Sequence, residues 1–197
     1  MRPSADQPGL FDTPSALPSG FRYRPDFLAP DEEQSLIEAI QHLPLEAARY
    51  REFTAKRRIL SFGYGYDFSS HVMTSAVPLP AFLEPLRARV GELGGIALGD
   101  FRQCTIAEYA PGTQLGWHRD VPNFAVVAGV SLAAPCRMRL RRYPHEKRGT
   151  ERPLALTLEP RSAYVFRDEA RWRWQHAISP TKALRYSVTF RTLRSGA

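Results

Sequence analysis

His118 and Asp120 stand two residues apart, and a third candidate metal ligand, His176, follows much later in the chain. On an extended segment, residues two apart point to the same side, so Arg119 between them would point away. Two histidines and one carboxylate supply three ligands to one side of an octahedral metal and leave the other side open, as in non-haem Fe(II) oxygenases. We therefore predict a metal site of His118, Asp120 and His176, with a distant strand delivering the last ligand.

The carboxy-terminal segment 184–192 alternates apolar and polar residues, which is typical of a strand. One of its faces would be polar and carry two arginines and two hydroxyls, from Arg185, Ser187, Thr189 and Arg191. Because a guanidinium fork matches a carboxylate, we predict that this face binds a dicarboxylate co-substrate, with the Tyr109 hydroxyl in the same pocket. The alternative is a solvated outer face with scattered arginines. Together with the three metal ligands, the segment favours the use of Fe(II), 2-oxoglutarate and O2.

The composition is that of an ordinary globular chain with an excess of positive charge. The 197 residues carry a formal net charge of +7 and fit one domain, which we expect to be a monomer. A basic excess predicts a polyanionic partner, most commonly nucleic acid, although plain solubility charge is the alternative. We expect no membrane span and no secretory signal, and therefore a cytoplasmic protein. Cys104 and Cys136 are expected to be buried thiols.

A basic stretch, 49–58, is followed closely by aromatic residues. Cations can hold phosphates while aromatic rings stack on bases, so this region is a candidate for contacts with a nucleic-acid substrate. The candidate substrate residues, which also include a tryptophan beside the first metal ligand, are Arg57, Arg58, Phe62, Tyr64, Tyr66 and Trp117. Core packing is the alternative for the aromatic residues. The second basic stripe, 137–142, has arginines at alternate positions and could contact a polyanion or face solvent.

The pattern along the chain predicts helices first and strands later. Residues 1–20 contain four prolines and are expected to form a flexible tail. A first helix is predicted from Asp31, as N-cap, to Leu43, and a second over 80–93 with Pro85 in its first turn. Beyond residue 100 the alternation indicates about seven strands. The predicted class is α+β, mainly β: a double-sheet jelly roll with two supporting amino-terminal helices.

Several stretches together resemble the AlkB family of nucleic-acid dioxygenases. They are 109–112 (YAPG), 116–120 (GWHRD), 129–132 (GVSL), 169–172 (EARW), 176–180 (HAISP) and 185–191 (RYSVTFR). The paired-arginine segment is the most specific of these, and the stretches cover most of residues 101–194. Residues 56–67 also resemble the substrate lid of some branches of the family.

The resemblance implies a double-stranded β-helix that binds Fe(II) through His118, Asp120 and His176. It implies that Arg185 and Tyr109 hold the distal carboxylate of 2-oxoglutarate, and that Arg191 lies near the metal-chelating end. Within the domain expected over 21–197, residues 21–100 would give helical support and the substrate lid, and 101–194 the catalytic jelly roll. The implied reaction removes alkyl groups from DNA or RNA bases oxidatively, as in DNA repair or RNA demethylation, and yields succinate, CO2 and an aldehyde.

The chain departs from the family pattern at three positions. Ala107 and Ser187 stand where the family often has asparagine, and Pro122 stands where the better-known repair enzymes have an acidic residue that reads the damaged base. These departures keep open a hydroxylase or demethylase of a protein or small molecule. A catalytically inactive nucleic-acid-binding module is a third alternative, but it would need neither the metal ligands nor the arginine pair.

Overall fold

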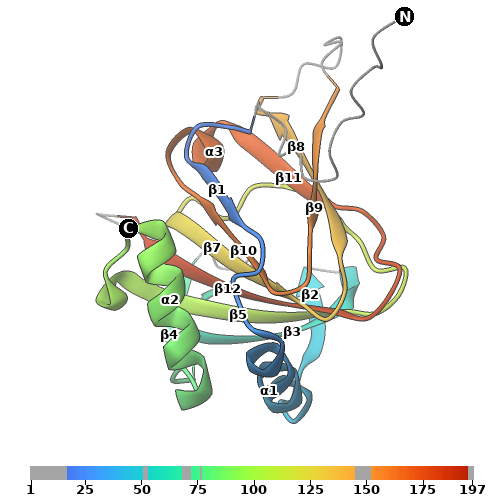
Figure 1. Ribbon diagram of the computed structural model, residues 1–197. Coiled ribbons are helices and arrows are strands. Elements are labelled where there is room, and N and C mark those ends of the chain that lie inside the picture. Colours follow the sequence, from blue (N-terminus) through green and yellow to red (C-terminus); the bar gives the residue numbers. More distant parts are fainter. Residues whose placement is uncertain (1–16, 51–52, 68–71, 76, 145–151, 195–197) are drawn as a thin grey trace, which may run out of the picture.

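The structure is a computed structural model that describes residues 17–50, 53–67, 72–75, 77–144 and 152–194. Two antiparallel sheets pack face to face, and the two longer helices cover the outer face of the larger sheet (Figure 1). The larger sheet has eight strands, one of which, β4 (Val72–Ser75), pairs only with β3. The other seven strands run in the order β1 (Phe21–Arg24), β10 (Ser162–Phe166), β7 (Phe124–Leu132), β12 (Arg185–Leu193), β5 (Phe101–Tyr109), β3 (Phe53–Asp67) and β2 (Glu46–Tyr50).

The smaller sheet has four strands and carries the two histidines of the predicted metal site. Its order is β6 (Leu115–His118), β11 (Trp174–Ile178), β8 (Cys136–Arg142) and β9 (Leu154–Leu158). The β11–β6 register shifts between the pairs His176–His118 and Ile178–Leu115. This bulge, in which three steps on β6 match two on β11, interrupts the alternation, so that Leu115 and His118 both face the space between the sheets. The predicted mainly-β jelly roll is confirmed.

Both predicted amino-terminal helices are present, with shifted boundaries. Helix α1 (Pro30–Gln41) begins two residues earlier than expected: Ala29 is the N-cap instead of Asp31, and its N–H donates to Oε2 of Glu32 at 2.7 Å. Proline at the first helical position explains the earlier start, because its fixed φ suits that position. Helix α2 (Glu84–Gly94) follows a 3-10 turn, Ala81–Leu83, and ends at Gly95 with φ of 64°.

The seven strands predicted after residue 100 are all present, and further elements accompany them. The region 46–75, expected as helical support and lid, instead contains β2, β3 and β4, and β3 extends the larger sheet beside β5. Strand β6 and the short helix α3 (Asp168–Trp172) were also not predicted as elements. Apart from β3, these elements have only four or five residues, too few for a periodic pattern to identify them.

Most of the expected tail, residues 1–16, lies outside the described residues. Residues 17–20 belong to the folded body: Pro18 O accepts from Phe21 N, Ser19 O accepts from Ala170 N, and Leu17 packs against the smaller-sheet core. The expected tail therefore ends before residue 17. In the described part of the chain, no helix is both long and apolar enough to cross a membrane.

Two apolar cores hold the layers together. The first lies between the helices and the larger sheet and includes Ile40, Val90 and Phe190, all fully buried. The second lies between the sheets and includes Met138, Leu140 and Phe166. Cys104 belongs to the first core and Cys136 to the second, and both are free thiols, as predicted. The larger sheet is therefore covered on both faces, and the space between the sheets that the second core does not fill is the cavity described next.

Candidate metal and co-substrate site

The two strands β6 and β11 and the loop after β6 bring the three predicted ligands together. One ligand atom each from His118, Asp120 and His176 lie within 4.8 Å of one another, and Nε2 of His176 is 3.9 Å from Oδ2 of Asp120. The two histidines are direct cross-strand partners, which fixes their rings 4.1 Å apart between centroids. Nδ1 of His118 lies 2.8 Å from the carbonyl oxygen of Gly116, so Nδ1 carries the proton and Nε2 keeps its lone pair for a cation.

The electrostatics of this cluster favour the protonation states that a divalent metal requires. Burial lowers the pKa of His118, and burial together with the neighbouring His118 ring lowers the pKa of His176 to about 3. Burial on its own would raise the pKa of Asp120, but Arg191, the two imidazoles and Arg171 hold it well below its usual value. At neutral pH the cluster is therefore two neutral imidazoles and one carboxylate, the state that binds metal without releasing a ligand proton.

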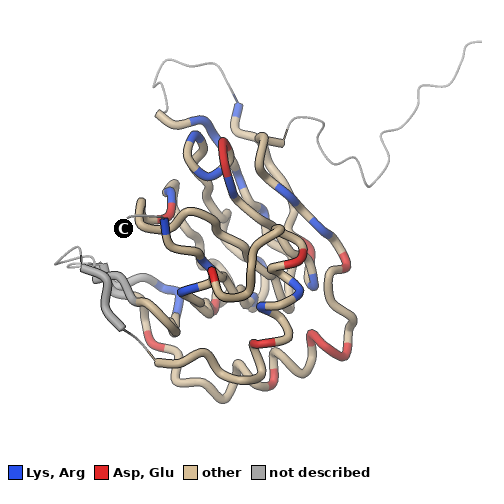
Figure 2. Tube along the Cα trace, turned by 90° about the vertical axis from the view of Figure 1, so that its left-hand side faces the viewer, with Lys and Arg blue, Asp and Glu red and all other residues tan. Residues whose placement is uncertain are grey.

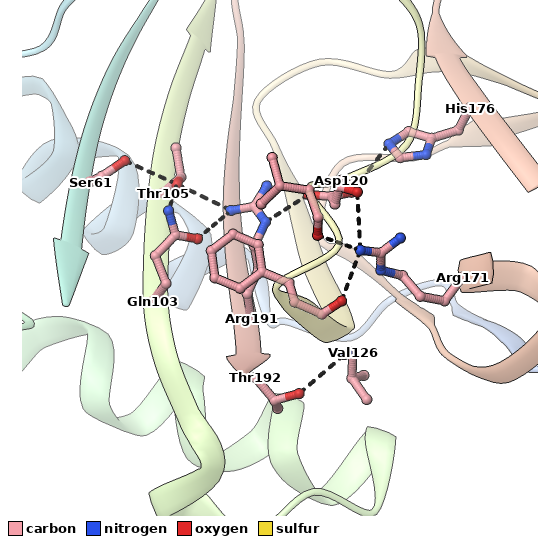
Figure 3. A network of polar contacts seen from close by, with 11 residues as sticks. Ser61, Gln103, Thr105, Asp120, Val126, Arg171, His176, Arg191 and Thr192 are labelled. Carbon is pink, nitrogen blue, oxygen red and sulfur yellow. Dashed lines mark hydrogen bonds and ion pairs between the residues drawn. The ribbon is translucent and has the colours of Figure 1, made fainter. Parts of the chain in front are cut away.

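Arg191 fixes the orientation of the Asp120 carboxylate (Figure 3). Its Nε donates to Oδ1 of Asp120 at 2.7 Å, and Nη1 donates to Oε1 of Gln103 at 2.7 Å and to Oγ1 of Thr105 at 3.1 Å. Gln103 in turn donates to Thr105, and Thr105 shares a hydrogen bond with Ser61 on the next strand. The guanidinium is thus held between the larger sheet and the metal-ligand loop.

Arg171, from α3, fixes the loop that follows Asp120. Its Nη2 donates to the carbonyl oxygens of Asp120 at 3.1 Å, Val121 at 2.7 Å and Phe124 at 2.8 Å (Figure 3). The Arg171 residue is only 3% exposed, and its hydrogen bond to Phe124 is buried while the other two are partly buried. Sequence reasoning missed this residue, because a lone arginine in a short helix carries no pattern that indicates such a contact.

The triad lies on the wall of a cavity of about 360 Å³ between the two sheets. This volume is at the lower end of the range for small-molecule sites. The four residues predicted for co-substrate binding all line the cavity, and alternation on β12 and β5 puts them on its larger-sheet wall: Tyr109, Arg185, Ser187 and Arg191. The alternative of a solvated outer face is therefore wrong, because the opposite face of β12 packs against the helices.

Arg185 is a buried cation with no acidic partner among the residues that the structure describes. It is 1% exposed, its Nε donates to Oγ of Ser131 at 3.0 Å, and its guanidinium carbon lies 4.9 Å from the centroid of the Tyr109 ring. Among the described residues no carboxylate forms an ion pair with it. A buried charge is costly unless it is paired, so this end of the cavity suits a carboxylate supplied by a ligand.

Tyr164 is a second cavity residue that sequence reasoning missed. It is the cross-strand partner of Gly129, and its ring lies so close to that glycine that an added Cβ would fall within 2.7 Å of Cε1 and closer still to Cζ and the hydroxyl. Burial raises the pKa of Tyr164 to about 12, although the charge of Arg185 opposes the shift. The hydroxyl therefore remains protonated and able to donate. A glycine inside the apolar run 124–132 was the available signal.

The candidate substrate residues on β3 are divided by strand alternation. Arg57 lines the cavity together with Ile59 and Ser61, which the sequence did not single out. Arg58 faces the other way and forms an ion pair with Glu108, with Nε and Nη2 each 2.7 Å from a carboxylate oxygen. The expectation that Phe62 stacks on a base is wrong, because its ring is 3% exposed and belongs to the helix-side core.

The other aromatic candidates do not line the cavity where the structure describes them. Tyr64 is 40% exposed, with Arg102 over its ring. The side chain of Tyr66 lies outside the described residues. Trp117 does not line the cavity either: its ring lies under Arg139 and Arg141 on the smaller sheet. The cation and aromatic residues of this set therefore do not form one substrate surface.

The three departures from the AlkB pattern have defined places. Ser187 is the cross-strand partner of both Ala107 and Ser131, so the two positions where the family often has asparagine are neighbours on the cavity wall. Both positions carry small side chains here, and the hydroxyl of Tyr164 is a further polar group near Arg185 in the same cavity. Pro122 lies in the turn that Arg171 holds, and it offers no side-chain hydrogen bond to a ligand.

Comparison with known proteins agrees with this geometry. Residues 20–191 match the model of the 2OG-Fe(II) oxygenase superfamily. An Arabidopsis thaliana alkylated DNA repair protein ALKBH8 homolog is 31% identical over 190 residues, covering 86% of this chain and 53% of the relative. A Xenopus tropicalis tRNA (carboxymethyluridine(34)-5-O)-methyltransferase alkbh8 is 28% identical, covering 85% of this chain but 26% of the relative. The chain thus spans about half of the first of these relatives and about a quarter of the second.

Solved structures share the fold at low sequence identity. The structure of OsALKBH1 superposes with a TM-score of 0.71 at 16% identity, covering 90% of this chain and 98% of the other. A Pseudomonas putida prolyl-4-hydroxylase gives a TM-score of 0.59 at 18% identity, covering 89% and 93%. Because the superfamily model matches most of its length, the chain belongs to the 2OG-Fe(II) oxygenase superfamily, whose members use Fe(II), 2-oxoglutarate and O2.

Proposed function

We propose that this dioxygenase binds Fe(II) through His118, Asp120 and His176 and uses it to oxidise alkyl groups on nucleic-acid bases. One carboxylate and two neutral imidazoles are a donor set that suits Fe(II) and leaves positions open toward the cavity. When bound, the iron and its co-substrate supply the activation of O2. The protein contributes the orientation of the ligands, through Gly116 and Arg191, and the cavity between the two sheets.

The observation that carries this proposal is Arg185, which is buried in the same cavity as the triad and pairs with no carboxylate among the described residues. Its guanidinium would pair with the distal carboxylate of 2-oxoglutarate, assisted by hydroxyls of Tyr109, Tyr164 and Ser187 on the same walls. The co-substrate would then extend from Arg185 toward the triad, with its chelating end near Arg191. We propose a dicarboxylate because a cation would lie at each end of the cavity: Arg185 at one end, and the bound metal near Arg191 at the other.

The substrate class follows from the relatives and from charge. The names of two relatives refer to alkylated DNA repair and to a carboxymethyluridine of tRNA, so both concern nucleic acid. The sequence carries a net charge of +7, which attracts polyanions. In the proposed reaction 2-oxoglutarate, O2 and an alkylated base give succinate, CO2 and a hydroxylated alkyl group, and a hydroxymethyl on nitrogen then leaves as formaldehyde to restore the base.

The test is succinate formation from 2-oxoglutarate by the Fe(II)-loaded protein in the presence of a substrate panel. The panel contains N-methylated DNA and RNA oligonucleotides, a tRNA anticodon stem-loop with a modified wobble uridine, and peptide and small-molecule controls. We expect stimulation by one of the nucleic acids together with the matching change in base mass. Stimulation by peptides or small molecules alone would replace this proposal with a hydroxylase or demethylase of those substrates.

Variants separate the enzyme class from the substrate. His118→Ala, Asp120→Ala and His176→Ala should each abolish Mn(II) binding, used as a probe for the iron site, while circular dichroism shows a folded protein. Each removes one of only three proposed ligands. Full turnover in any of these variants would contradict the ligand assignment whatever the substrate is.

A further inference from the structure

The outer face of the smaller sheet is basic and lies directly behind the metal ligands. Arg137, Arg139 and Arg141 occupy alternate positions of β8 and point away from the second core, into which Met138 and Leu140 point. Successive arginines are therefore separated by two strand residues, about 6.6 Å. Leu140, between the last two, is the cross-strand partner of His176, so this arginine row lies on the back of the strands that hold the triad.

Trp117 orders part of this row. The guanidinium carbons of Arg139 and Arg141 lie 5.0 and 4.3 Å from the centroid of the Trp117 ring, and Nε of Arg141 donates to Oε1 of Gln175 at 2.8 Å. An arginine stacked on an aromatic ring keeps in-plane N–H groups available for a second partner, and its orientation is already restricted before that partner binds. The bulge in β6 is what turns Trp117 to this face while His118 points inward.

No acidic side chain described on the sheet forms an ion pair with the arginine row. Arg142, the fourth arginine of the stripe, pairs with Glu169 at 3.5 Å and is therefore left out of the row. In the part of the chain that the structure describes, none of Arg137, Arg139 and Arg141 forms an ion pair with a carboxylate. Figure 2 shows Lys and Arg along the upper strands, while many of the Asp and Glu residues lie in the lower part of the molecule.

Arg119 connects the arginine row to the cavity. It is one residue from His118, lies on the cavity wall, and its guanidinium stacks 3.6 Å from the centroid of the Tyr143 ring, just beyond the end of β8. Its Nη1 donates to the carbonyl oxygen of Trp172 at 2.9 Å, which fixes its position at this edge. Positive charge therefore continues from the back of the smaller sheet, around the end of β8, to the wall of the cavity.

We propose that Arg137, Arg139 and Arg141 bind the phosphate backbone of a single-stranded nucleic acid whose target base occupies the cavity. This inference rests on the proposed nucleic-acid substrate and assigns the surface that holds the strand outside the cavity. Alternating guanidinium groups on a strand offer a row of forked donors that matches a row of phosphates, and such contacts carry no base specificity. The row would therefore set affinity and strand path, while the cavity selects the base.

The test compares two charge-reversal pairs that change net charge equally. Arg137→Glu with Arg139→Glu alters the row, whereas Arg22→Glu with Arg24→Glu alters two exposed arginines, also two residues apart, on edge strand β1. In each pair one arginine has no described side-chain contact and the other has one, with Trp117 for Arg139 and with the Leu93 carbonyl for Arg22. Fluorescence anisotropy measures binding of an oligothymidylate long enough to reach both cavity and row, and of a trinucleotide.

We expect the row variant to lose on the order of tenfold in affinity for the long strand at low salt. Its plot of log affinity against log salt should flatten by about 1.4, since each phosphate contact on a single strand contributes about 0.7. The β1 variant should keep the wild-type slope, and trinucleotide binding should differ little among the three proteins. If charge reversal prevents folding, judged from the melting curve, Arg137→Gln with Arg139→Gln should flatten the slope in the same way.

Four results would overturn the inference. Equal losses in the row and β1 variants would show a general charge effect, and equal losses for long strand and trinucleotide would show damage to the cavity. Unchanged binding of the long strand by the row variant would show that the strand runs elsewhere, with the nucleic-acid function intact. Failure of the wild-type protein to bind either oligonucleotide at low salt would instead overturn the nucleic-acid function itself, and this inference with it.

Discussion

Arg191 divides the two oxygens of the Asp120 carboxylate between different tasks. Nε of Arg191 donates to Oδ1 at 2.7 Å, whereas Oδ2 lies 3.9 Å from Nε2 of His176 and faces the remaining ligands. Only Oδ2 is thus presented to a metal, as in sites where an outer hydrogen bond orients a ligand. Since Gln103 holds the same guanidinium, the position of a proposed iron ligand depends on a side chain of the larger sheet.

Replacing Arg191 by lysine should therefore weaken metal binding without removing a ligand. Lysine keeps the charge but cannot donate to Asp120 and Gln103 from one rigid plane. We expect Mn(II) affinity, measured by electron paramagnetic resonance titration, to fall by about 10- to 100-fold, the usual effect of losing such an outer contact. Arg142→Lys, at the exposed pair with Glu169, is the control and should bind Mn(II) as the wild type does. Unchanged affinity in Arg191→Lys would contradict the orienting role.

Arg185→Gln should remove the preference for a second carboxylate on the co-substrate. Losing a hydrogen bond to a charged group costs about 1.5–3 kcal/mol, or more than tenfold in affinity. Calorimetry on the Mn(II)-loaded protein should show wild type binding 2-oxoglutarate far more tightly than 2-oxobutyrate, which lacks the distal carboxylate. The variant should bind the two about equally. A preference that survives the substitution would place the distal carboxylate away from Arg185.

The parts of the site that could be predicted from the sequence are those set by residues close together along the chain. Arg185 and Arg191 face the cavity because their strand alternates. His118 and Asp120 lie close together because only one residue separates them, but Asp120 is in the loop after β6, and Arg119, expected to point away, also lines the cavity. Apart from Arg119, these relations are decided within a few residues, so the sequence was sufficient. His176 meets the other two ligands only because β11 pairs with β6. The predicted metal site implied such a pairing, but nothing in the sequence identified the two strands as neighbours.

The substrate residues on β3 were harder to predict because alternation does not say which side is the inside. Arg57 and Phe62 stand an odd number of positions apart, so they cannot share a face of one regular strand, and the structure turns only Arg57 to the cavity. Strand β3 was not predicted as an element, because basic residues interrupt the apolar alternation in its first half. Arg171 and Tyr164 depend on contacts across the fold, for which spacing along the chain gives no information.

The ion pair between Arg58 and Glu108 predicts a pH-dependent contribution to stability. Hydrogen bonding to Arg58 is the main cause that lowers the pKa of Glu108 from its usual 4.5. The pair therefore stabilises the fold above pH 4.5, and this contribution is lost as pH falls through the lowered folded pKa. Arg58→Ala should cost no more than about 1 kcal/mol at pH 7, because the arginine is half exposed.

Urea unfolding at several pH values would check this expectation. The difference between wild type and Arg58→Ala should be largest near neutral pH and should shrink toward zero below the folded pKa of Glu108. Arg24→Ala, at an exposed arginine with no described partner, should show no such trend. A difference that persists unchanged into acid would mean that Arg58 acts through packing of its aliphatic stem instead.

Gly129 and Tyr164 should behave as a coupled pair. Gly129→Ala would place a methyl group within 2.7 Å of the Tyr164 ring and push the ring into the cavity, since the sheet backbone on the other side cannot yield. Overpacking of this kind costs about 1–3 kcal/mol, so the melting temperature should fall by several degrees. The displaced ring should also weaken 2-oxoglutarate binding, because it occupies the space beside Arg185.

A double-mutant cycle tests this coupling. In a Tyr164→Ala background the added methyl meets no ring, so Gly129→Ala should then change stability little, and the two effects should be strongly non-additive. Gly99→Ala is the matched control, because an added Cβ there meets no atom within 4 Å. Tyr164→Phe keeps the ring and removes only the hydroxyl, so it should preserve the melting temperature while weakening 2-oxoglutarate binding several-fold. Additive effects in the cycle would mean that Gly129 is required for strand geometry and not for the position of Tyr164.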